Sequence, residues 1–446
     1  MKRSSTRGQR LRRGEPGFDE AVLGTSFSGR DPGLRPEILV QANDVDEVVA
    51  ALREATANSW QVAVCSGGHS WSQNHLREDG LLLDLSRLRS IRIDAGARRA
   101  VAGPGTWAIE LDGALKKHRL FFPIAHALDV GLGGFLLQGG FGWNSRALGL
   151  ACEHVVGLDL VLADGSLVHA NAEQNADLYW AARGAGSGFF AVVVAYHLRL
   201  HPRPGFTGMV LQSYRAEHLE AVFAWAEQVG PDVPRSVELQ LLMTQKAMVA
   251  NGPGIEIVAP VLAESYDTAR RDCSFLTSSK LRRKASVALP LFPISTTMMT
   301  RLATRRLFPP GMRWSVDNMW TDAPMTELLP GLRRILETMP PAPTHALWMN
   351  WYPPSRRPDM AFSVEAKHYL ALYGEWKSVE ADARHNGWAA NRMREMAPMS
   401  RGIQLADEGI KLRPARFLSD ENMKKLDAVR AARDPYGRFH DYRGRV

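Results

Sequence analysis

The stretch VCSGGHSWSQ, residues 64–73, places two adjacent glycines and a histidine directly after a short run of strand-forming residues. Because Gly67 and Gly68 carry no Cβ, their backbone N–H groups can approach a phosphate closely. His69 could ligate a metal, lie on an ordinary surface turn, or act together with the glycines on one ligand. The GxGxxG dinucleotide spacing and the Gly-Lys-Ser/Thr of a P-loop are both missing here. The stretch alone leaves these interpretations open.

A second stretch, DVGLGGFLLQGGFGWNSRALGLA from residue 129, is richer still in glycine. Its glycines are Gly131, Gly133, Gly134, Gly139, Gly140, Gly142 and Gly149. Each would weaken a helix or strand by roughly 0.5–1 kcal/mol relative to alanine, which a chain usually tolerates where a ligand lies against the backbone. A third segment of this kind, RGAGSGFF, begins at residue 183. Three such loops predict one large, flat, phosphate-bearing cofactor held mainly by backbone amides.

The elements that must position these loops alternate between helix and strand in the first half of the chain. Asp44 can cap a helix whose apolar residues recur at helical spacing, and a short buried strand follows that helix. Two β-hairpins are predicted, over residues 89–106 and over residues 155–170, the second turning at Asp164. Helical stretches become longer after Pro204, where we place the boundary of a second domain.

Length and composition limit the class of protein. A chain of 446 residues is too long for one ordinary core, so we expect two domains. With 45% hydrophobic and 23% charged residues it is typical of a soluble globular protein, and no apolar run approaches the roughly 20 residues of a membrane span. The N-terminal MKRSSTRGQRLRRG is basic without an apolar segment, which argues against a secretory signal. A net charge of +8 supports nucleic-acid binding only weakly, and three cysteines without a CxxC pair predict no disulfide, no metal site and a cytoplasmic location.

Four segments resemble the berberine bridge enzyme-like branch of the vanillyl-alcohol oxidase flavoproteins. The SGGHS turn is similar to that family's R-S-G-G-H-S signature, and the stretch from residue 129 with the following hairpin resembles its second cofactor loop. DLYWAARGAGSGFFAVVVAYHLRL, from residue 177, is similar to the family's D-L-F-W-A-L-R-G-G-G-G-N-F-G-V-V-T segment. NMKKLDAVRAARDPYGRF, from residue 422, resembles its C-terminal N-x-x-R-L-x-x-I-K-x-x-Y-D-P-x-x-x-F. The resemblance covers about residues 35–200 and 415–440, in the family's order and spacing.

The resemblance implies an α+β protein in two parts. A two-part FAD-binding domain of the PCMH type would span residues 35–204, after a basic tail and lead-in over residues 1–34. An α+β substrate domain with an antiparallel sheet flanked by helices would span residues 205–410, and residues 411–446 would return to the FAD-binding domain. FAD would lie with its ADP half in the first domain and its ring at the interface.

The resemblance also implies which residues contact FAD. In the family the histidine of the first motif bonds covalently to the 8α-methyl of the flavin ring, and His69 occupies that position. Many relatives add a second bond from a cysteine, but the matching residue here is Ala127, so we expect a single link. The expected cofactor-binding residues are Ser66, Gly67, Gly68, His69, Ser70, Val130, Gly131, Gly133, Gly134, Gly139, Gly140, Gly142, Val193 and Asn422. The chain departs from the family's pattern at Cys65, Phe135, Ser187, Gly188 and Phe190.

Hydride transfer needs a substrate C–H aimed at the flavin and a group that takes the proton of the adjoining O–H or N–H. A tyrosine or carboxylate on the sheet of the second domain commonly serves in the family. Alternating residues of a strand share one face, so Trp348, Asn350 and Tyr352 could form one pocket wall, although structural packing is the commoner fate of such residues. The catalytic candidates are Asn350, Tyr352, Tyr369, Tyr373 and Gln404.

Val130 matches the position that lies over the oxygen-reactive edge of the flavin in the family. A valine there resembles the oxidases and a bulkier residue the dehydrogenases, with plain packing as the alternative. We therefore expect an FAD-dependent oxidase that takes hydride from an alcohol, amine or activated C–H of a small molecule, for example an aromatic or secondary metabolite, and passes electrons to O2. The alternatives are a dehydrogenase with another acceptor and a flavin-bearing protein that binds or sequesters a drug. We expect a monomer or homodimer without nucleic-acid or membrane partners.

Overall fold

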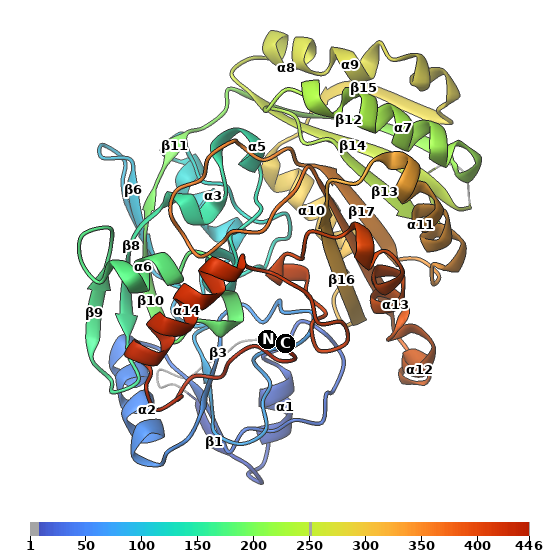
Figure 1. Cartoon of the computed structure of the whole chain (residues 1–446). Helices are drawn as coiled ribbons and strands as arrows, with labels where there is room; N and C mark the ends of the chain where they lie inside the picture. Colours follow the sequence, from blue (N-terminus) through green and yellow to red (C-terminus); the bar gives the residue numbers. More distant parts are fainter. Residues whose placement is uncertain (1–8, 249–251, 446) are drawn as a thin grey trace.

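The first of three principal sheets carries the SGGHS loop at the end of one strand. The computed structural model of the chain describes residues 9–248 and 252–445 (Figure 1). The sheet has the order β1 (Gln9–Arg12), β2 (Ile38–Gln41), β4 (Leu81–Asp84) and β3 (Val62–Cys65), and its last three strands are parallel. α1 (Phe18–Leu23) contacts β2, and α2 (Val45–Ala57) contacts β4. Asp44 caps α2 by accepting a hydrogen bond from the Glu47 N–H, as the sequence predicts.

Part of the expected N-terminal tail belongs to this sheet. β1 pairs antiparallel with β2 over all four of its residues, and Leu11 packs against the small apolar core under α1. Arg10 and Arg12 form ion pairs with Glu54 on α2. The expectation of a tail is therefore wrong from Gln9 onward, because backbone pairing and these ion pairs fix the strand. Residues 1–8 lie outside the described residues.

The second sheet is antiparallel and backs the other glycine-rich loops. Its order is β5 (Ile91–Asp94), β6 (Arg99–Ala102), β10 (Val192–Arg199), β8 (Val155–Val161) and β9 (Leu167–Ala170). Both predicted hairpins are present, and Gly165 takes the φ of +80° that the turn between β8 and β9 requires. The remaining elements of this part are α3 (Ala108–Lys116), β7 (Leu120–Phe121), α4 (Leu132–Leu137), α5 (Ser145–Leu148), α6 (Ala176–Ala181) and β11 (His201–Pro202). One apolar core joins the first two sheets.

The third sheet has seven antiparallel strands and forms the centre of the second domain. Its order is β15 (Val287–Pro293), β12 (Phe206–Arg215), β14 (Gly254–Ala263), β13 (Gln240–Thr244), β17 (His345–Asn350), β18 (His368–Trp376) and β16 (Arg313–Thr321). The helices of this domain are α7 (Leu219–Val229), α8 (Tyr266–Asp272), α9 (Ser274–Thr277), α10 (Thr296–Leu307), α11 (Met325–Thr338), α12 (Asp382–His385) and α13 (Trp388–Glu395). α7, α11 and α13 cover the face turned away from the first domain (Figure 1), which confirms the expected α+β class. Within residues 9–248 and 252–445, no helix is long and apolar enough to cross a membrane.

The chain returns to the first domain at its C-terminal end. α14 (Asp420–Arg433) begins at Ser419, whose side chain accepts a hydrogen bond from the Asn422 N–H, and it packs against α6 (Figure 1). The following residues run back to β3, where Phe439 forms a parallel bridge with Val62. The last described residues therefore lie beside the strand that leads into the SGGHS loop.

Candidate active site

A cavity of about 650 Å³ lies between the two domains and contains most of the residues that the glycine-rich motifs predicted. Loops of the first domain form one side, and β13, β17 and β18 of the second domain contribute to the other. The expected cofactor residues that line it are Ser66, Gly67, Gly68, His69, Ser70, Val130, Gly131, Gly133, Gly134, Gly140 and Val193. The volume is within the roughly 300–1,000 Å³ of small-molecule sites.

Three expected cofactor residues are absent from this cavity's lining and shape the chain around it. A Cβ on Gly142 would lie 2.4 Å from a neighbouring carbonyl oxygen, and Gly139 has a φ of +98°, in the region that favours glycine. Asn422 donates side-chain hydrogen bonds to the carbonyl oxygens of Met360 and Ala361 at 2.9 and 3.1 Å. Gly139 and Gly142 therefore allow the backbone of the second glycine-rich loop to fold, and Asn422 connects α14 to residues 360 and 361.

The two glycine-rich loops meet backbone to backbone. A Cβ on Gly67 would lie 2.4 Å from the Gly131 nitrogen, and a Cβ on Gly133 would lie 2.4 Å from the Ser66 Oγ. The Ser66 Oγ accepts a hydrogen bond from the Gly134 N–H at 3.3 Å, whereas a Cβ on Gly134 would meet no atom within 4 Å. Most of these glycines thus allow the loops to touch, and Gly134 leaves an open stretch of backbone on the cavity wall.

His69 is held in one orientation by two contacts. Its ring stacks on Phe27 with centroids 4.2 Å apart, and its Nε2 lies 2.8 Å from Asp129 Oδ1. Burial acts to raise the pKa of Asp129, but the hydrogen bond and charge of His69 together hold that pKa below its ordinary value. An ionised carboxylate can only accept a hydrogen bond, so Nε2 carries a proton. In the neutral form of the ring, Nδ1 then keeps its lone pair.

A half-buried carboxylate, Asp407, lies on the cavity wall of the second domain. It accepts hydrogen bonds from Trp71 Nε1 at 2.7 Å and from the hydroxyls of Tyr369 and Tyr373 at 2.5 and 2.9 Å. Burial raises the pKa of this carboxyl, against the effect of the three donors. Burial and the adjacent Asp407 also raise the pKa of both tyrosines, which therefore keep their protons. Within this trio the carboxylate is the group that can accept a proton.

Trp71 joins the histidine loop to the carboxylate. Its ring lies 6.1 Å from the His69 ring, edge to face, while its Nε1 donates to Asp407. A second acidic residue also binds this loop, because the side chains of Ser72 and Asn74 both donate hydrogen bonds to the buried Glu408. Two adjacent acidic residues of the second domain therefore fix the loop that carries His69, and they set the position of His69 relative to Asp407.

The alternation of β17 places Asn350 and Tyr352 outside the cavity. His345, Leu347 and Met349 line the cavity, whereas the intervening side chains turn toward the helices. Asn350 donates to the Gly230 carbonyl oxygen at 3.0 Å, and the Tyr352 ring packs edge to face on His368. The expected pocket wall of Trp348, Asn350 and Tyr352 is therefore wrong, because that face of the segment turns away from the cavity and the opposite face of β17 lines it.

Gln404 does line the cavity. Its Nε2 donates to the Gln138 carbonyl oxygen at 3.3 Å, and its backbone exchanges two hydrogen bonds with the side chain of Asn318. Gln404 therefore connects β16 to the second glycine-rich loop, three residues before Asp407. The sequence signal for Asp407 is a pair of adjacent acids, Asp407 and Glu408, directly after Leu405 and Ala406.

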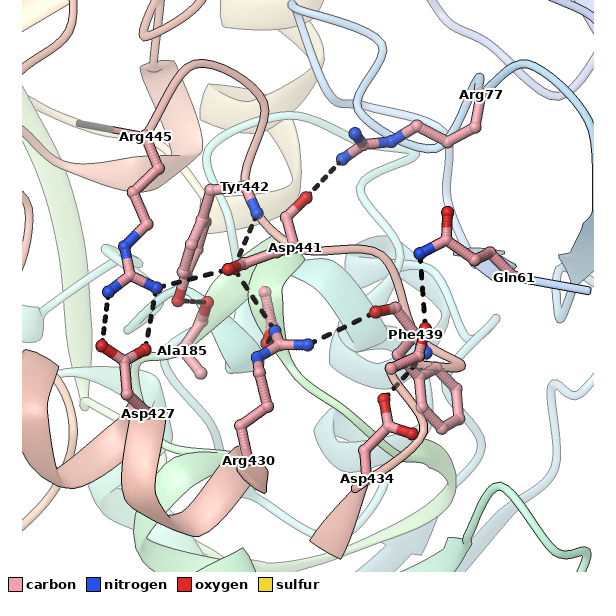
Figure 2. A network of polar contacts seen from close by, with 12 residues as sticks. Gln61, Arg77, Ala185, Asp427, Arg430, Asp434, Phe439, Asp441, Tyr442 and Arg445 are labelled. Atoms are coloured by element: carbon pink, nitrogen blue, oxygen red, sulfur yellow. Dashed lines mark hydrogen bonds and ion pairs between the residues drawn. The ribbon is translucent and has the colours of Figure 1, made fainter. Parts of the chain in front are cut away.

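The C-terminal segment contributes a further wall that the motifs did not predict. Phe439 and His440 line the cavity, after the chain has returned to β3. Figure 2 shows how this segment is held, with Arg77 donating to the Asp441 carbonyl oxygen at 2.9 Å. Arg77 also lines the cavity, so the same contact joins two of its walls.

The C-terminal segment explains two departures from the family's pattern, Gly188 and Phe190. The Tyr442 hydroxyl donates to the Ala185 carbonyl oxygen at 2.5 Å (Figure 2). A Cβ on Gly188 would lie 2.2 Å from Tyr442 Cζ. Phe190 lies under the Arg430 guanidinium at 5.2 Å. The altered third glycine-rich loop thus fits this chain's own C-terminal segment.

Cys65 and Phe135 account for two more departures. Cys65 is buried at the end of β3, where burial raises the pKa of its thiol well above the ordinary value, so it is an inert packing residue. Phe135 lines the cavity, as do Ser187 and Ala127.

The part of the cavity beyond these loops is mostly apolar. Its aliphatic and aromatic lining comes from β12, β13, β14, α10, β17 and the residue after α10: Met209, Leu211, Leu242, Val258, Met299, Leu302, Leu307, Phe308, Leu347 and Met349. Polar groups there include Gln240, Arg305 and His345. This end suits the body of an apolar molecule better than that of a sugar.

These residues fit FAD. The glycine backbones leave an open wall at Gly134 on which a diphosphate can lie, and His69 lines the same cavity and contacts Asp129 through Nε2 rather than Nδ1. The carboxylate of Asp407 faces that cavity from the opposite domain. Backbone that can approach a diphosphate and a carboxylate that can accept a proton meet two requirements of a flavin and its substrate, and the imidazole offers a nitrogen for attachment.

Comparison with known proteins assigns the family. Residues 36–171 match the family described as "FAD binding domain". FAD-linked oxidoreductase penO of Penicillium crustosum is 30% identical over 432 residues, which cover 96% of this chain and 95% of that protein. The chain belongs to the FAD-linked oxidoreductases. FAD-linked oxidoreductase nodO of Hypoxylon pulicicidum is also 30% identical, over 93% of this chain and 92% of its own length.

Solved structures share the fold of this FAD-linked oxidoreductase over nearly its whole length. 6-Hydroxy-D-nicotine oxidase from Arthrobacter nicotinovorans superposes with a TM-score of 0.84 at 20% identity, covering 98% of this chain and 97% of that chain. BBE-like 1 of Physcomitrella patens gives 0.84 at 17% identity, covering 97% and 96%. The resemblance to the berberine bridge enzyme-like branch of the vanillyl-alcohol oxidase family is thereby confirmed.

Proposed function

We propose that this chain is an FAD-dependent oxidase that removes a hydride from the carbon of an alcohol or amine, with FAD bound covalently through His69 and reoxidised by O2. The observation that carries the proposal is the placement of Asp407, a half-buried carboxylate held by three donors on the cavity wall opposite the glycine-rich loops. When bound, FAD supplies the oxidising chemistry by accepting the hydride.

Asp407 takes the proton of the substrate O–H or N–H while the adjoining C–H bond breaks. Tyr369 and Tyr373 donate to this carboxylate and hold it in place, and their raised pKa values keep them protonated throughout. The apolar walls exclude water from the reacting carbon. Gln404, the remaining polar candidate on this wall, positions the segment that carries Asp407.

The contact between His69 and Asp129 supports the covalent link. With the ring proton fixed on Nε2, the Nδ1 lone pair is the one available for bonding to the cofactor. Ala127 lines the cavity near this loop and carries no nucleophile. One link through His69 is therefore the proposed attachment.

The size of Val130 supports oxidase over dehydrogenase activity. Wild-type Phl p 4, a protein of the same fold, is a glucose dehydrogenase, and its isoleucine-to-valine variant is a glucose oxidase. Here Val130 lines the cavity between Asp129 and Gly131, at the position that the family resemblance places over the oxygen-reactive edge. The apolar substrate end supports a hydrophobic alcohol or amine as substrate, and the three buried free cysteines support a reducing cytoplasm.

An anaerobic absorbance screen tests the proposed function. Purified protein is mixed without oxygen with apolar secondary alcohols, apolar amines, phenols and glucose, and the flavin absorbance is followed. We expect an apolar alcohol or amine to bleach the flavin and air to restore its colour. Binding of these compounds without bleaching would instead favour a drug-sequestering protein, and bleaching that O2 fails to reverse would favour a dehydrogenase.

A further inference from the structure

Two histidines and an aspartate converge on the second sheet, outside the cavity described above. Asp159 comes from β8, His169 from β9 and His197 from β10, three neighbouring strands of the sheet (Figure 1). Asp159 lies directly opposite His169 in the antiparallel register. The cluster is thus built on rigid strands, and a sequence search for cysteine spacing could not find it.

The ligand atoms of these residues already face one another. Asp159 Oδ1 lies 2.7 Å from His169 Nδ1, and Asp159 Oδ2 lies 3.0 Å from His197 Nε2. The three side chains each offer one ligand atom, and these atoms lie within 4.8 Å of one another. Ligand atoms on a tetrahedral zinc ion are roughly 3.4 Å apart, so small side-chain rotations suffice to close the site.

We propose that Asp159, His169 and His197 bind one divalent transition-metal ion of the zinc class. Two imidazoles and one carboxylate suit zinc, copper or nickel, whereas calcium and magnesium prefer oxygen ligands throughout. The side chains are each about a third exposed, at 35%, 35% and 31%, so an ion can reach them from solvent and keep water in its open position.

The neighbouring Gly157 leaves room for the imidazoles. It lies directly opposite His197, and a Cβ on it would come within 3.1 Å of the His169 ring. A side chain at this position would press on the His169 imidazole and restrict its rotation. The absence of a side chain at Gly157 therefore leaves the His169 ring room to rotate toward an ion.

The site lies on the far face of the sheet from the cofactor cavity. Successive side chains of a strand point to opposite faces, and Tyr196, next to His197, lines the cavity. The Tyr196 hydroxyl donates to the Gly133 carbonyl oxygen in the second glycine-rich loop at 2.9 Å. An ion on the outer face would hold β8, β9 and β10 together behind that loop without touching the reacting atoms.

Zinc titration of the untagged holoprotein tests the proposal. After dialysis against a chelator, calorimetric titration with ZnCl2 should give one site per chain and a higher thermal unfolding temperature. His169→Gln and His197→Gln should each weaken zinc binding by at least about 10-fold. His118→Gln removes an exposed histidine elsewhere on the first domain and should leave the affinity unchanged.

Absence of one-to-one binding at micromolar zinc, or equal affinity in His169→Gln, His197→Gln and the parent protein, would overturn the proposal. If a variant fails to fold, Co²⁺ added to the parent protein decides the question. We expect the visible absorption of cobalt bound through nitrogen ligands, abolished by one equivalent of zinc. Cobalt that gives only the spectrum of the aqueous ion would contradict the site.

Discussion

Asp407→Asn is the substitution that separates proton transfer from the rest of the site. The asparagine Oδ1 can still accept from Trp71 Nε1, and its Nδ2 can donate to the oxygen atoms of Tyr369 and Tyr373. The three contacts of the carboxylate are therefore kept in a side chain of nearly the same shape. We expect the variant to fold and to bind FAD, while losing the proton acceptor.

The expected loss of rate follows from the contribution of a positioned general base to catalysis. Such a base contributes about 10²–10⁴-fold to the rate, which is about 3–5 kcal/mol at ~1.36 kcal/mol per tenfold. The rate constant for anaerobic bleaching of the flavin by substrate, measured by stopped flow, should fall by this factor. Burial raises the pKa of Asp407, and only the ionised form accepts a proton, so the parent rate should rise with pH through an inflection above the ordinary aspartate value. Asp407→Asn should lack that inflection.

Asp112→Asn is the matched control. Asp112 is 2% exposed and paired with Arg203 at 2.6 Å, so it is a hydrogen-bonded aspartate that is more buried than Asp407, and it is absent from the cavity lining. It should lower stability and leave the bleaching rate unchanged. If Asp407→Asn holds normal flavin yet reduces it within about threefold of the parent rate, a change below 1 kcal/mol, the assignment of the base is wrong.

Three further substitutions test other parts of the account. Val130→Ile should slow reoxidation when reduced protein is mixed with O2 and leave anaerobic bleaching unchanged; equal reoxidation rates would refute the role of this valine. Asp129→Asn should lower the fraction of chains that carry FAD in denaturing intact-mass measurements, because the imidazole loses its ionised partner; an undiminished fraction would count against it. Gly188→Ala places a Cβ 2.2 Å from Tyr442 Cζ and should lower the free energy of unfolding by about 1–3 kcal/mol. Gly113→Ala, with open space around its Cβ, is the control in the same urea titration, and equal losses would contradict the packing argument.

Features with local causes were predictable from the sequence. The cap of α2 at Asp44 depends on a few neighbouring residues, and so does the turn between β8 and β9. The glycine-rich loops were also predictable. So many glycines would weaken a helix or strand, so their presence indicates that another segment or a ligand approaches the backbone closely. Which glycines face the ligand was not, because Gly134 and Gly142 look alike in sequence and differ only in what surrounds their Cα atoms.

The proposed base, Asp407, could not be predicted from the sequence because its hydrogen-bond partners are far away along the chain. Asp407 is 336 residues from Trp71, 38 from Tyr369 and 34 from Tyr373, so no local pattern marks it as hydrogen-bonded. Tyr369 and Tyr373 were predicted as catalytic candidates and do line the cavity, although they serve the carboxylate as donors.

The face of a buried strand was also beyond the sequence. The alternation of side chains correctly placed Trp348 and Asn350 on the same face of β17. Neither face is open to solvent, because one lines the cavity and the other packs against helices. The alternation shows which side chains share a face of the strand, but it does not show which face lines the cavity. That choice depends on how the seven-stranded sheet packs against the first domain.

The central claim is that FAD is bonded to His69 in the cavity that Asp407 faces, and the mass of the denatured chain tests it most directly. The parent protein should give a yellow acid precipitate and an intact mass greater than that of the polypeptide by one FAD. His69→Ala should give a colourless precipitate, a yellow supernatant and the mass of the polypeptide alone. Flavin released from the parent chain by acid, or flavin retained by denatured His69→Ala, would contradict the account.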